Sequence, residues 1–290
     1  MIVSLTHGKH LGMMIARKAK IGHSNLAVDK FPDDELRVQF LFNPKGKRIF
    51  LVQSFYGNVS DCIMETILAA KTARELGAKK ISLIAPYFPY LRQDKRFRPN
   101  EAVSQYIVAD MIDGYFDQVF IIDPHLHRTK SLGNIFKTKS VRLTANPLII
   151  EYIKNKMKDP LIIGPDEESF KWAKFVADAV GAECRILKKK RYSSYHVKVE
   201  LNKKIEIRGR NVVIVDDIIS TGHTIMQTCK ILRRLGAKNV YCICVHGIFA
   251  NDALKKLERS QVKVISTNTI PNKASRIDVS EIIADGLNDD

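Results

Sequence analysis

The sequence lacks any long hydrophobic run. No segment approaches the roughly 20 apolar residues that a membrane-spanning helix needs, and the first residues, "MIVSLTHGKHLGMMIARKAK", lack the apolar core of an export signal. Both absences argue against membrane insertion and export. We therefore expect a soluble, cytoplasmic protein.

Cysteines are few and show no metal-binding pattern. The five cysteines contain no C-x-x-C pair, which argues against a zinc scaffold or a disulfide framework. Cys242 and Cys244 alternate within "VYCICV", as residues on one buried face of a strand do. We expect free thiols in a reducing compartment.

The common nucleotide-binding motifs are also missing. Neither the G-x-x-x-x-G-K-[ST] loop nor the G-x-G-x-x-G turn occurs, so no motif supports a P-loop nucleotidase or a dinucleotide-binding protein. A phosphate-binding protein of this sequence must therefore hold its phosphate in another way.

Positive charge, in contrast, is abundant. The formal net charge is +16, and such proteins attract nucleic acid, anionic membranes or phosphorylated metabolites. The chain shows no nucleic-acid-binding module or aromatic stacking pattern, so nucleic acid is the least favoured partner. Residues 187–196, "LKKKRYSSYH", place four consecutive cations outside any amphipathic helix. This segment is interpreted either as a mobile anion-binding loop or as a solvated linker.

Two halves of the chain share one plan. Residues 48–88 and 211–249 each read strand, loop, helix, L-G-A-K and strand, which is the pattern of a β-α-β unit. With 45% hydrophobic residues among 290, the chain predicts two α/β domains, 1–144 and 145–290, each a mainly parallel sheet flanked by helices. The last short helix, "DVSEIIADGL", is a candidate for packing back on the first domain.

The stretch "VVIVDDIISTGHT" (residues 212–224) predicts a binding site at the end of a strand. Asp216 and Asp217 follow a buried aliphatic run, and their carboxylates suit sugar hydroxyls or a cation. A loop of small and hydroxyl residues then opens a helix, whose N-terminus suits a phosphate. The loop consists of Ser220, Thr221, Gly222, His223 and Thr224. A phosphorylated sugar satisfies both halves, whereas an ordinary capped turn does not require two consecutive acids.

Other aliphatic runs end in chemically active residues as well. Cations gather in "YLRQDKRFR" (90–98), where we expect an anion, and acidic groups or histidines follow in "IIDPHLH" (121–127) and "LIIGPDEES" (161–169). Ligands of open α/β sheets bind at the carboxyl ends of strands. The presence of charged residues and histidines at several strand ends therefore indicates a ligand-binding site at that edge of the sheet. Taken singly, His125 and His127 are interpreted as structural residues.

In order along the chain, "FPDDE" (31–35), "YLRQDKRF" (90–97), "DPH" (123–125), "GPD" (164–166), "KKR" (189–191) and "VDDIISTGHT" (215–224) resemble the ribose-phosphate diphosphokinase (phosphoribosyl pyrophosphate synthase) family, its archaeal members above all. The resemblance implies two phosphoribosyltransferase-like domains. It also implies transfer of the diphosphoryl group of MgATP to the 1-hydroxyl of ribose 5-phosphate, giving phosphoribosyl diphosphate and AMP. The implied cofactor is Mg²⁺, and the implied assembly is a homo-oligomer, a dimer or larger, with a shared active site.

The resemblance also implies roles for individual residues. ATP is expected to contact Phe31, Asp33 and Glu35 of a neighbouring subunit together with Arg92, Gln93 and His125. His125 and Asp166 are expected near Mg²⁺, Asp216 and Asp217 on the ribose hydroxyls, residues 220–224 on the 5-phosphate, and Lys189 and Arg191 on the transferring group. His223 departs from the family, which usually has glycine there. Residues 167–170, "EESF", also differ, so no role beyond Asp166 is assigned in that segment.

Two related interpretations remain open. A phosphoribosyltransferase that consumes phosphoribosyl diphosphate shares the "VDDIISTGHT" pattern, and a non-catalytic regulatory subunit could bind the same ligand. "FPDDE" and "RQDK" argue against the first, because such an enzyme needs no adenine pocket. Lys189 and Arg191 argue against the second.

Overall fold

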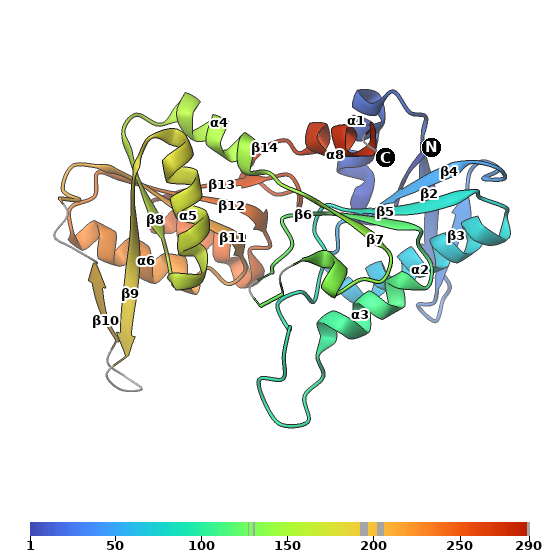
Figure 1. Cartoon of the computed structure of the whole chain (residues 1–290), viewed down its shortest axis with the longest axis horizontal. Coiled ribbons are helices and arrows are strands. Elements are labelled where there is room, and N and C mark those ends of the chain that lie inside the picture. The colour runs from blue at the N-terminus through green and yellow to red at the C-terminus, as the bar shows by residue number, and fades with distance from the viewer. Residues whose placement is uncertain (127, 130, 192–196, 202–205, 289–290) are drawn as a thin grey trace. The chain divides into compact units, whose positions relative to one another are not determined.

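The computed structural model describes residues 1–126, 128–129, 131–191, 197–201 and 206–288. The chain divides into two compact units, Met1–Thr144 with Val279–Asp290 and Ala145–Asp278. Each unit contains one seven-stranded sheet flanked by helices (Figure 1). Within the described residues, no helix is both long and apolar enough to cross a membrane.

The first sheet has the strand order β3-β2-β1-β4-β5-β6-β7. Only β2 and β3 pair antiparallel, and every other neighbouring pair is parallel. The strands are β1 (Ile2–Ser4), β2 (His23–Lys30), β3 (Leu36–Phe40), β4 (Arg48–Val52), β5 (Lys80–Ala85), β6 (Gln118–Ile122) and β7 (Lys139–Leu143). The central strands are mostly buried and apolar because helices cover both of their faces.

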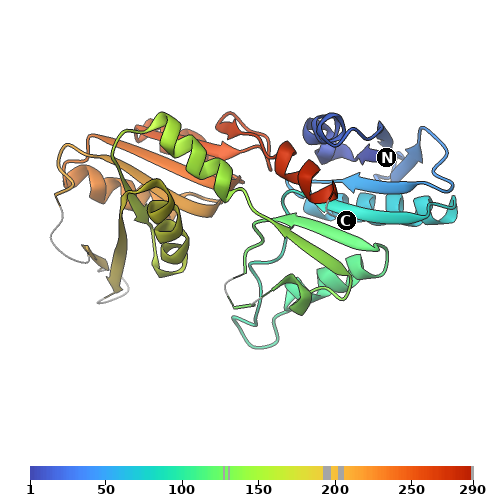
Figure 2. The same ribbon diagram turned by 45° about the horizontal axis from the view of Figure 1, so that its top comes forward.

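Helices α2 (Val59–Glu75) and α3 (Ser104–Asp113) cover one face of this sheet, and α1 (Lys9–Ala19) and α8 (Ser280–Asn288) cover the other (Figure 1). Leu51, Leu83 and Ile121 belong to the core beneath α2 and α3. The C-terminal helix α8 lies beside α1 in both ribbon views (Figure 1 and Figure 2), and Lys18 Nζ lies 3.0 Å from Glu281 Oε2. Short 3-10 helices occupy Thr6–Gly8 and Leu132–Asn134.

The second sheet repeats the same order, β10-β9-β8-β11-β12-β13-β14. Its single antiparallel pair is again at the edge, between β9 and β10. The strands are β8 (Pro160–Gly164), β9 (Glu183–Arg191), β10 (Val197–Leu201), β11 (Asn211–Ile219), β12 (Asn239–Gly247), β13 (Val262–Thr267) and β14 (Ser275–Ile277). The predicted pair of mainly parallel α/β sheets is therefore confirmed.

In the second unit, α4 (Asn146–Lys156) packs on α5 (Glu167–Val180), and α6 (His223–Arg234) packs on α7 (Ala253–Arg259), which follows a 3-10 turn at Ala250–Asp252. The strand–helix–strand pattern shared by residues 48–88 and 211–249 corresponds to β4-α2-β5 and β11-α6-β12. Gly77 and Gly236 end their helices with φ of +85° and +84°, the left-handed geometry that favours glycine after a helix. Cys242 and Cys244 are buried on β12, and all five cysteines are free thiols.

Two expectations from the sequence need correction. Strand β9 continues through Lys189 to Arg191, so the first half of the expected 187–196 loop is a strand, while residues 192–196 lie outside the described part of the chain. Strand β11 does not end at the acidic pair but runs on to Ile219, because Asp216 and Ile218 still pair with Cys244 and His246 of β12. Backbone pairing to a long neighbour outweighs the low strand propensity of aspartate.

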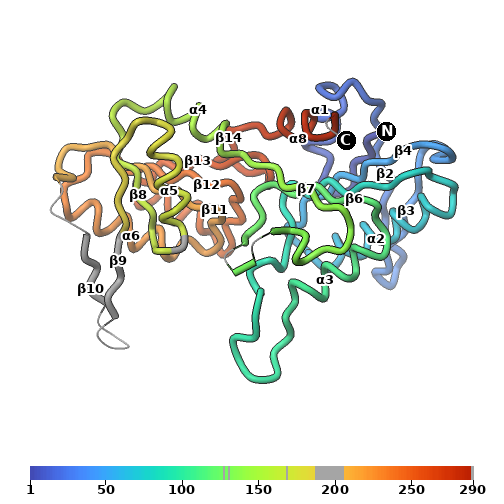
Figure 3. Tube along the Cα trace, viewed as in Figure 1, coloured from blue at the N-terminus to red at the C-terminus, as the bar shows by residue number. Residues whose placement is uncertain are grey.

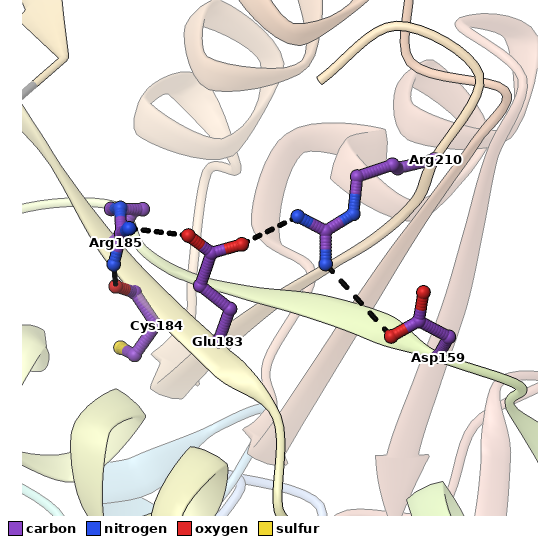
Figure 4. A network of polar contacts seen from close by, with 5 residues as sticks. All are labelled: Asp159, Glu183, Cys184, Arg185 and Arg210. Carbon is purple, nitrogen blue, oxygen red and sulfur yellow. Dashed lines mark hydrogen bonds and ion pairs between the residues drawn. The ribbon is translucent and has the colours of Figure 1, made fainter. Parts of the chain in front are cut away.

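A charged network joins the opposite, amino ends of the strands in the second unit (Figure 4). Glu183 at the start of β9 accepts hydrogen bonds from Arg185 and from Arg210, which precedes β11. Arg210 Nη2 also lies 4.0 Å from Asp159 Oδ1, just before β8. The Arg210 hydrogen bond, assisted by the charge of Arg185, lowers the pKa of Glu183. The network connects the starts of three neighbouring strands and leaves their carboxyl ends for ligands.

Candidate functional site

Asp216 and Asp217 lie near the carboxyl end of β11, between β8 and β12. Both are half-buried. Asp216 Oδ1 accepts a hydrogen bond from the Asp217 backbone N–H at 3.1 Å, and Asp217 Oδ1 accepts one from the Ile218 N–H at 2.8 Å. Each carboxylate is thus held by the backbone of the residue that follows it.

Burial raises the pKa of Asp216 well above its ordinary value, and the charges of Asp217 and Asp166 raise it further. Three carboxyl groups therefore converge at the ends of β8 and β11. The charged form of the Asp216 carboxyl group is destabilised until a cation or hydrogen-bond donors approach it. The electrostatics of this cluster fit a divalent cation or sugar hydroxyls.

Asp166 is positioned by the start of α5. Its Oδ1 accepts hydrogen bonds from the backbone N–H and the hydroxyl of Ser169, both at 2.9 Å, in a capping box. The first two residues of the "EESF" segment, which differs from the family pattern, begin α5. The cap gives Asp166 a fixed place beside the acidic pair.

The hydroxyl loop, residues 220–224, joins β11 to α6. Gly222 has φ of +68° and stands at the N-cap of α6, which has no side-chain cap among the described residues. In the same part of the chain, helices α1, α3, α4 and α7 also have no side-chain cap, whereas α5 has its capping box and α2 is capped by Asn58. The ordinary-turn interpretation requires Ser220 or Thr221 to cap α6, and neither side chain does so. The helix start is available for an anion.

His223 is the exposed first residue of α6 and turns toward the next turn of the helix. Its Nε2 lies 2.8 Å from the side-chain nitrogen of Gln227. Since an amide nitrogen donates, His223 Nε2 is the acceptor of this hydrogen bond. The imidazole is thus occupied by a partner on α6 itself.

The corresponding crevice of the first unit is closed by its own side chains. Gln53 and Ser54 follow β4 where the acidic pair extends β11, and Gln53 is fully buried. Gln53 Oε1 accepts from the His7 N–H at 2.9 Å, and Gln53 Nε2 donates to Glu65 at 3.2 Å. Glu65 also accepts from the Thr6 N–H at 2.7 Å. The Asp-Asp pair of β11 is thus replaced by Gln-Ser after β4, a change that is visible in the sequence.

The long loop between β5 and α3 projects from the first sheet (Figure 3) and carries two of the predicted ATP residues, Arg92 and Gln93. Arg92 is exposed, while the half-buried Gln93 accepts a hydrogen bond from the Ser104 hydroxyl at 2.8 Å. The Arg128 guanidinium, 2.9 Å from Asp94, connects this loop to the segment after β6. The sequence analysis missed Arg128, although a cation directly after "DPHLH" was a usable signal.

The segment after β6 carries His125. His125 is half-buried, and Asp123 is buried with φ of +36° and Arg142 at 3.9 Å. His127 lies outside the described residues. His125 belongs to the first unit and Asp166 to the second. The described residues contain no group of three or more His, Cys, Asp and Glu side chains with metal-binding geometry.

The β2–β3 turn presents Phe31, Asp33 and Glu35 to solvent. Phe31 is 46% exposed, with the Arg37 guanidinium 5.6 Å from its ring centre. The Phe31 N–H donates to the Glu35 carbonyl at 2.8 Å, which holds the turn tight. The Phe31 ring is therefore exposed beside acidic side chains at the tip of the β2–β3 hairpin.

Lys189 and Arg191 lie in β9, where their backbones are paired with Val199 and Val197 of β10. They alternate along the strand with Lys188 and Lys190. The hairpin of β9 and β10 is the counterpart, in the second sheet, of the β2–β3 hairpin that carries Phe31.

Comparison with known proteins gives a consistent result. A family model described as the N-terminal domain of ribose phosphate pyrophosphokinase matches residues 1–115, and one described as the phosphoribosyl transferase domain matches residues 131–281. The ribose-phosphate pyrophosphokinase of Pyrococcus furiosus is 35% identical over 96% of this chain and 97% of its own length. Ribose-phosphate pyrophosphokinase 2 of Archaeoglobus fulgidus is 36% identical over 96% of each chain. The crystal structure of phosphoribosylpyrophosphate synthetase from Mycobacterium smegmatis aligns with a TM-score of 0.88 at 25% identity, covering 99% of this chain and 97% of that one.

Proposed function

Because this chain belongs to the ribose-phosphate pyrophosphokinase family, we propose that the residues described above divide the reaction of that family between the two units. The protein is an enzyme of nucleotide biosynthesis. It transfers the diphosphoryl group of ATP to the 1-hydroxyl of ribose 5-phosphate and releases AMP.

Ribose 5-phosphate binds at the carboxyl end of β11. The observation that carries this proposal is the uncapped start of α6 next to three converging carboxyl groups. Residues 220–224 hold the 5-phosphate through backbone N–H groups and hydroxyls. Asp216 and Asp217 accept hydrogen bonds from the ribose hydroxyls.

In the transfer step, the sugar's 1-hydroxyl oxygen bonds to the β-phosphorus of ATP. The bond from that phosphorus to the α,β-bridging oxygen breaks, AMP leaves with the bridging oxygen, and the hydroxyl proton is released. Negative charge grows on AMP as it leaves, so cations that meet it there lower the barrier. Lys189 and Arg191 of β9 supply these charges. No covalent nucleophile is needed.

The adenine of ATP is held by two copies of the chain. Arg92 and Gln93 of one copy form one side of the pocket, and Phe31, Asp33 and Glu35 of a neighbouring copy form the other. The exposure of Phe31 supports this arrangement, as does the contrast between the acidic β2–β3 turn and the cationic loop that contains Arg92. The active assembly is therefore a homo-oligomer, a dimer or larger, in the cytoplasm.

Mg²⁺ is the proposed cofactor. Carboxylate oxygens such as those of Asp166, Asp216 and Asp217 are the ligands that a hard cation prefers, and the burial of Asp216 beside the other two charges raises its pKa. Asp166 and His125 are the residues that would hold it. When bound, the ion neutralises charge on the phosphate oxygens.

The decisive experiment separates AMP from ADP. The purified protein is mixed with ribose 5-phosphate, ATP and Mg²⁺, and nucleotides are resolved by chromatography. We expect AMP equal to the phosphoribosyl diphosphate formed, and no reaction in the presence of EDTA. Stoichiometric ADP, or no turnover when Mg²⁺ is restored, would reject the assignment.

A further inference from the structure

A strained segment packs against the hydroxyl loop and has no role in the proposed reaction. After β12 the chain turns through residues 247–253, "GIFANDA", which we call the brace. Phe249, Asn251 and Asp252 have φ of +49°, +55° and +58°. Left-handed backbone is uncommon for any residue with a side chain and most unusual for a large aromatic one.

One end of the brace contacts Ile219, just before the hydroxyl loop, and the other end lies against Gly222 within the loop. The N–H groups of Ile248 and Phe249 both donate to the Ile219 carbonyl at 3.0 Å, at the last residue before Ser220. At the other end, a Cβ on Gly222 would stand 3.4 Å from Ala253 Cβ and 3.4 Å from Leu257 Cδ1. The loop therefore begins on the brace and makes its sharp turn against the start of α7.

Phe249 is the part of the brace that fixes its conformation. Its ring covers Gly247 so closely that a Cβ there would lie 2.4 Å from Phe249 Cε2. The half-buried ring also packs against the core that contains Ile219 and Ile225, the residues on either side of the hydroxyl loop. This packing offsets the cost of the left-handed backbone, which is of the order of 1 to 3 kcal/mol for such a residue.

We propose that Phe249 is a positioning residue: it holds the brace in its strained form so that residues 220–224 keep the shape that binds a sugar phosphate. The inference rests on the proposed ribose 5-phosphate site. Its ligand is the 5-phosphate group and not the nucleotide, because the brace hydrogen-bonds to Ile219 and lies against Gly222 of the β11–α6 connection, where the 5-phosphate is proposed to bind. Strained backbone of this kind persists where the surrounding structure over-determines it, as at ligand-binding loops.

The test is equilibrium binding of ribose 5-phosphate, measured by calorimetry with Mg²⁺ present. Phe249→Ala is expected to weaken binding about tenfold or more, the effect of one lost hydrogen bond to a charged group, with the affinity for ATP unchanged within about twofold. Phe249→Tyr keeps the ring and should restore wild-type affinity. If Phe249→Ala does not fold, Phe249→Leu, which keeps much of the volume but not the ring, replaces it.

The matched control is Ile207→Ala, which truncates the same core at the opposite, amino end of the strands. It should lower the melting temperature and leave ribose 5-phosphate binding unchanged. Unchanged binding in folded Phe249→Ala, or equal weakening in both variants, overturns the proposal. Binding is measured without turnover. A wild type that binds ribose 5-phosphate but releases no AMP would therefore reject the proposed reaction without rejecting the positioning role of Phe249.

Discussion

Asp216 shows how a single side chain can serve binding at the expense of stability. Its pKa is raised by burial and by the charges of Asp217 and Asp166, so the folded protein holds this proton more tightly than the unfolded chain does. The stability contributed by the neutral carboxyl group is complete at low pH and is lost as the pH rises through the raised pKa. Above the raised pKa, the ionised group therefore destabilises the unliganded protein while it is ready to accept ligand hydrogen bonds.

We expect Asp216→Asn to raise the melting temperature of the unliganded protein by a few degrees at a pH above the raised pKa of Asp216, since about 1 kcal/mol shifts it by about 2–4 °C in a protein of this size. The gain should shrink as the pH falls through that pKa. The same variant should lower kcat/KM for ribose 5-phosphate about 10- to 100-fold, because a charged acceptor is lost. Calorimetry over pH and the rate of AMP formation measure the two effects, with exposed Asp285→Asn as control. Unchanged sugar-dependent kinetics would contradict the ribose role.

His223 and Gly222 are neighbours with opposite expected sensitivities. The His223 ring is engaged by Gln227, so backbone N–H groups, and not this side chain, are expected to bind the phosphate. His223→Gly should keep KM for ribose 5-phosphate within about threefold of wild type. Gly222→Ala should raise that KM markedly, because its φ of +68° strains any residue with a Cβ by about 1 kcal/mol or more. Abolished activity in folded His223→Gly would show that the histidine has a specific role.

At the scale of elements, β9 and β10 form an edge hairpin, and β9 carries the proposed catalytic cations Lys189 and Arg191. If this hairpin approaches the transferring group only as the reaction proceeds, its charges meet the transition state more strongly than the ground state. Removing them should then lower kcat more than it raises KM.

Lys189→Ala and Arg191→Ala are each expected to lower kcat about 100- to 1000-fold, the usual effect of losing one transition-state contact of about 3 to 4 kcal/mol. Lys188→Ala, a cation at the alternating position of the same strand, is the control and should lose little. Steady-state kinetics at several salt concentrations decide the matter. Equal losses in all three variants, reproduced in wild type by added salt, would reduce the cationic run to a general electrostatic attractor.

At the scale of the whole molecule, the proposed adenine pocket requires two copies of the chain. Phe31→Ala removes the part that one copy lends to its neighbour, and Asp217→Ala removes the sugar part of the recipient site. Mixing the two inactive variants should restore a fraction of wild-type activity, because hybrid assemblies contain some intact composite sites. Rates of AMP formation before and after mixing are the measurement. No recovery between subunits that demonstrably exchange would argue against a shared site.

Local chemistry made much of this protein readable from its sequence. Aliphatic runs broken by loops and helical spacing predict two α/β units, and the Asp-Asp pair followed by small hydroxyl residues predicts a sugar-phosphate site at a strand end. Both inferences depend on neighbours in the chain, and parallel topology then brings strand ends to one edge. The sequence predicts β9 and β11 to be shorter than they are. The length of a strand depends on its partner strand, which no local pattern shows.

The remaining properties were decided only by tertiary structure, because each depends on groups far apart in the sequence. The pKa of Asp216 is raised first by burial and then by the charges of Asp217 and of Asp166, which lies 50 positions away at the start of α5. The closed crevice of the first unit requires Glu65 to meet Thr6 and Gln53. Helix α8 is visible as a short amphipathic segment, yet its ion pair joins residues 263 positions apart. Phe249 reads as an ordinary core residue until its left-handed backbone and its place beneath the hydroxyl loop are seen. Burial and electrostatic interaction depend on distance in space, so only the folded chain could determine them.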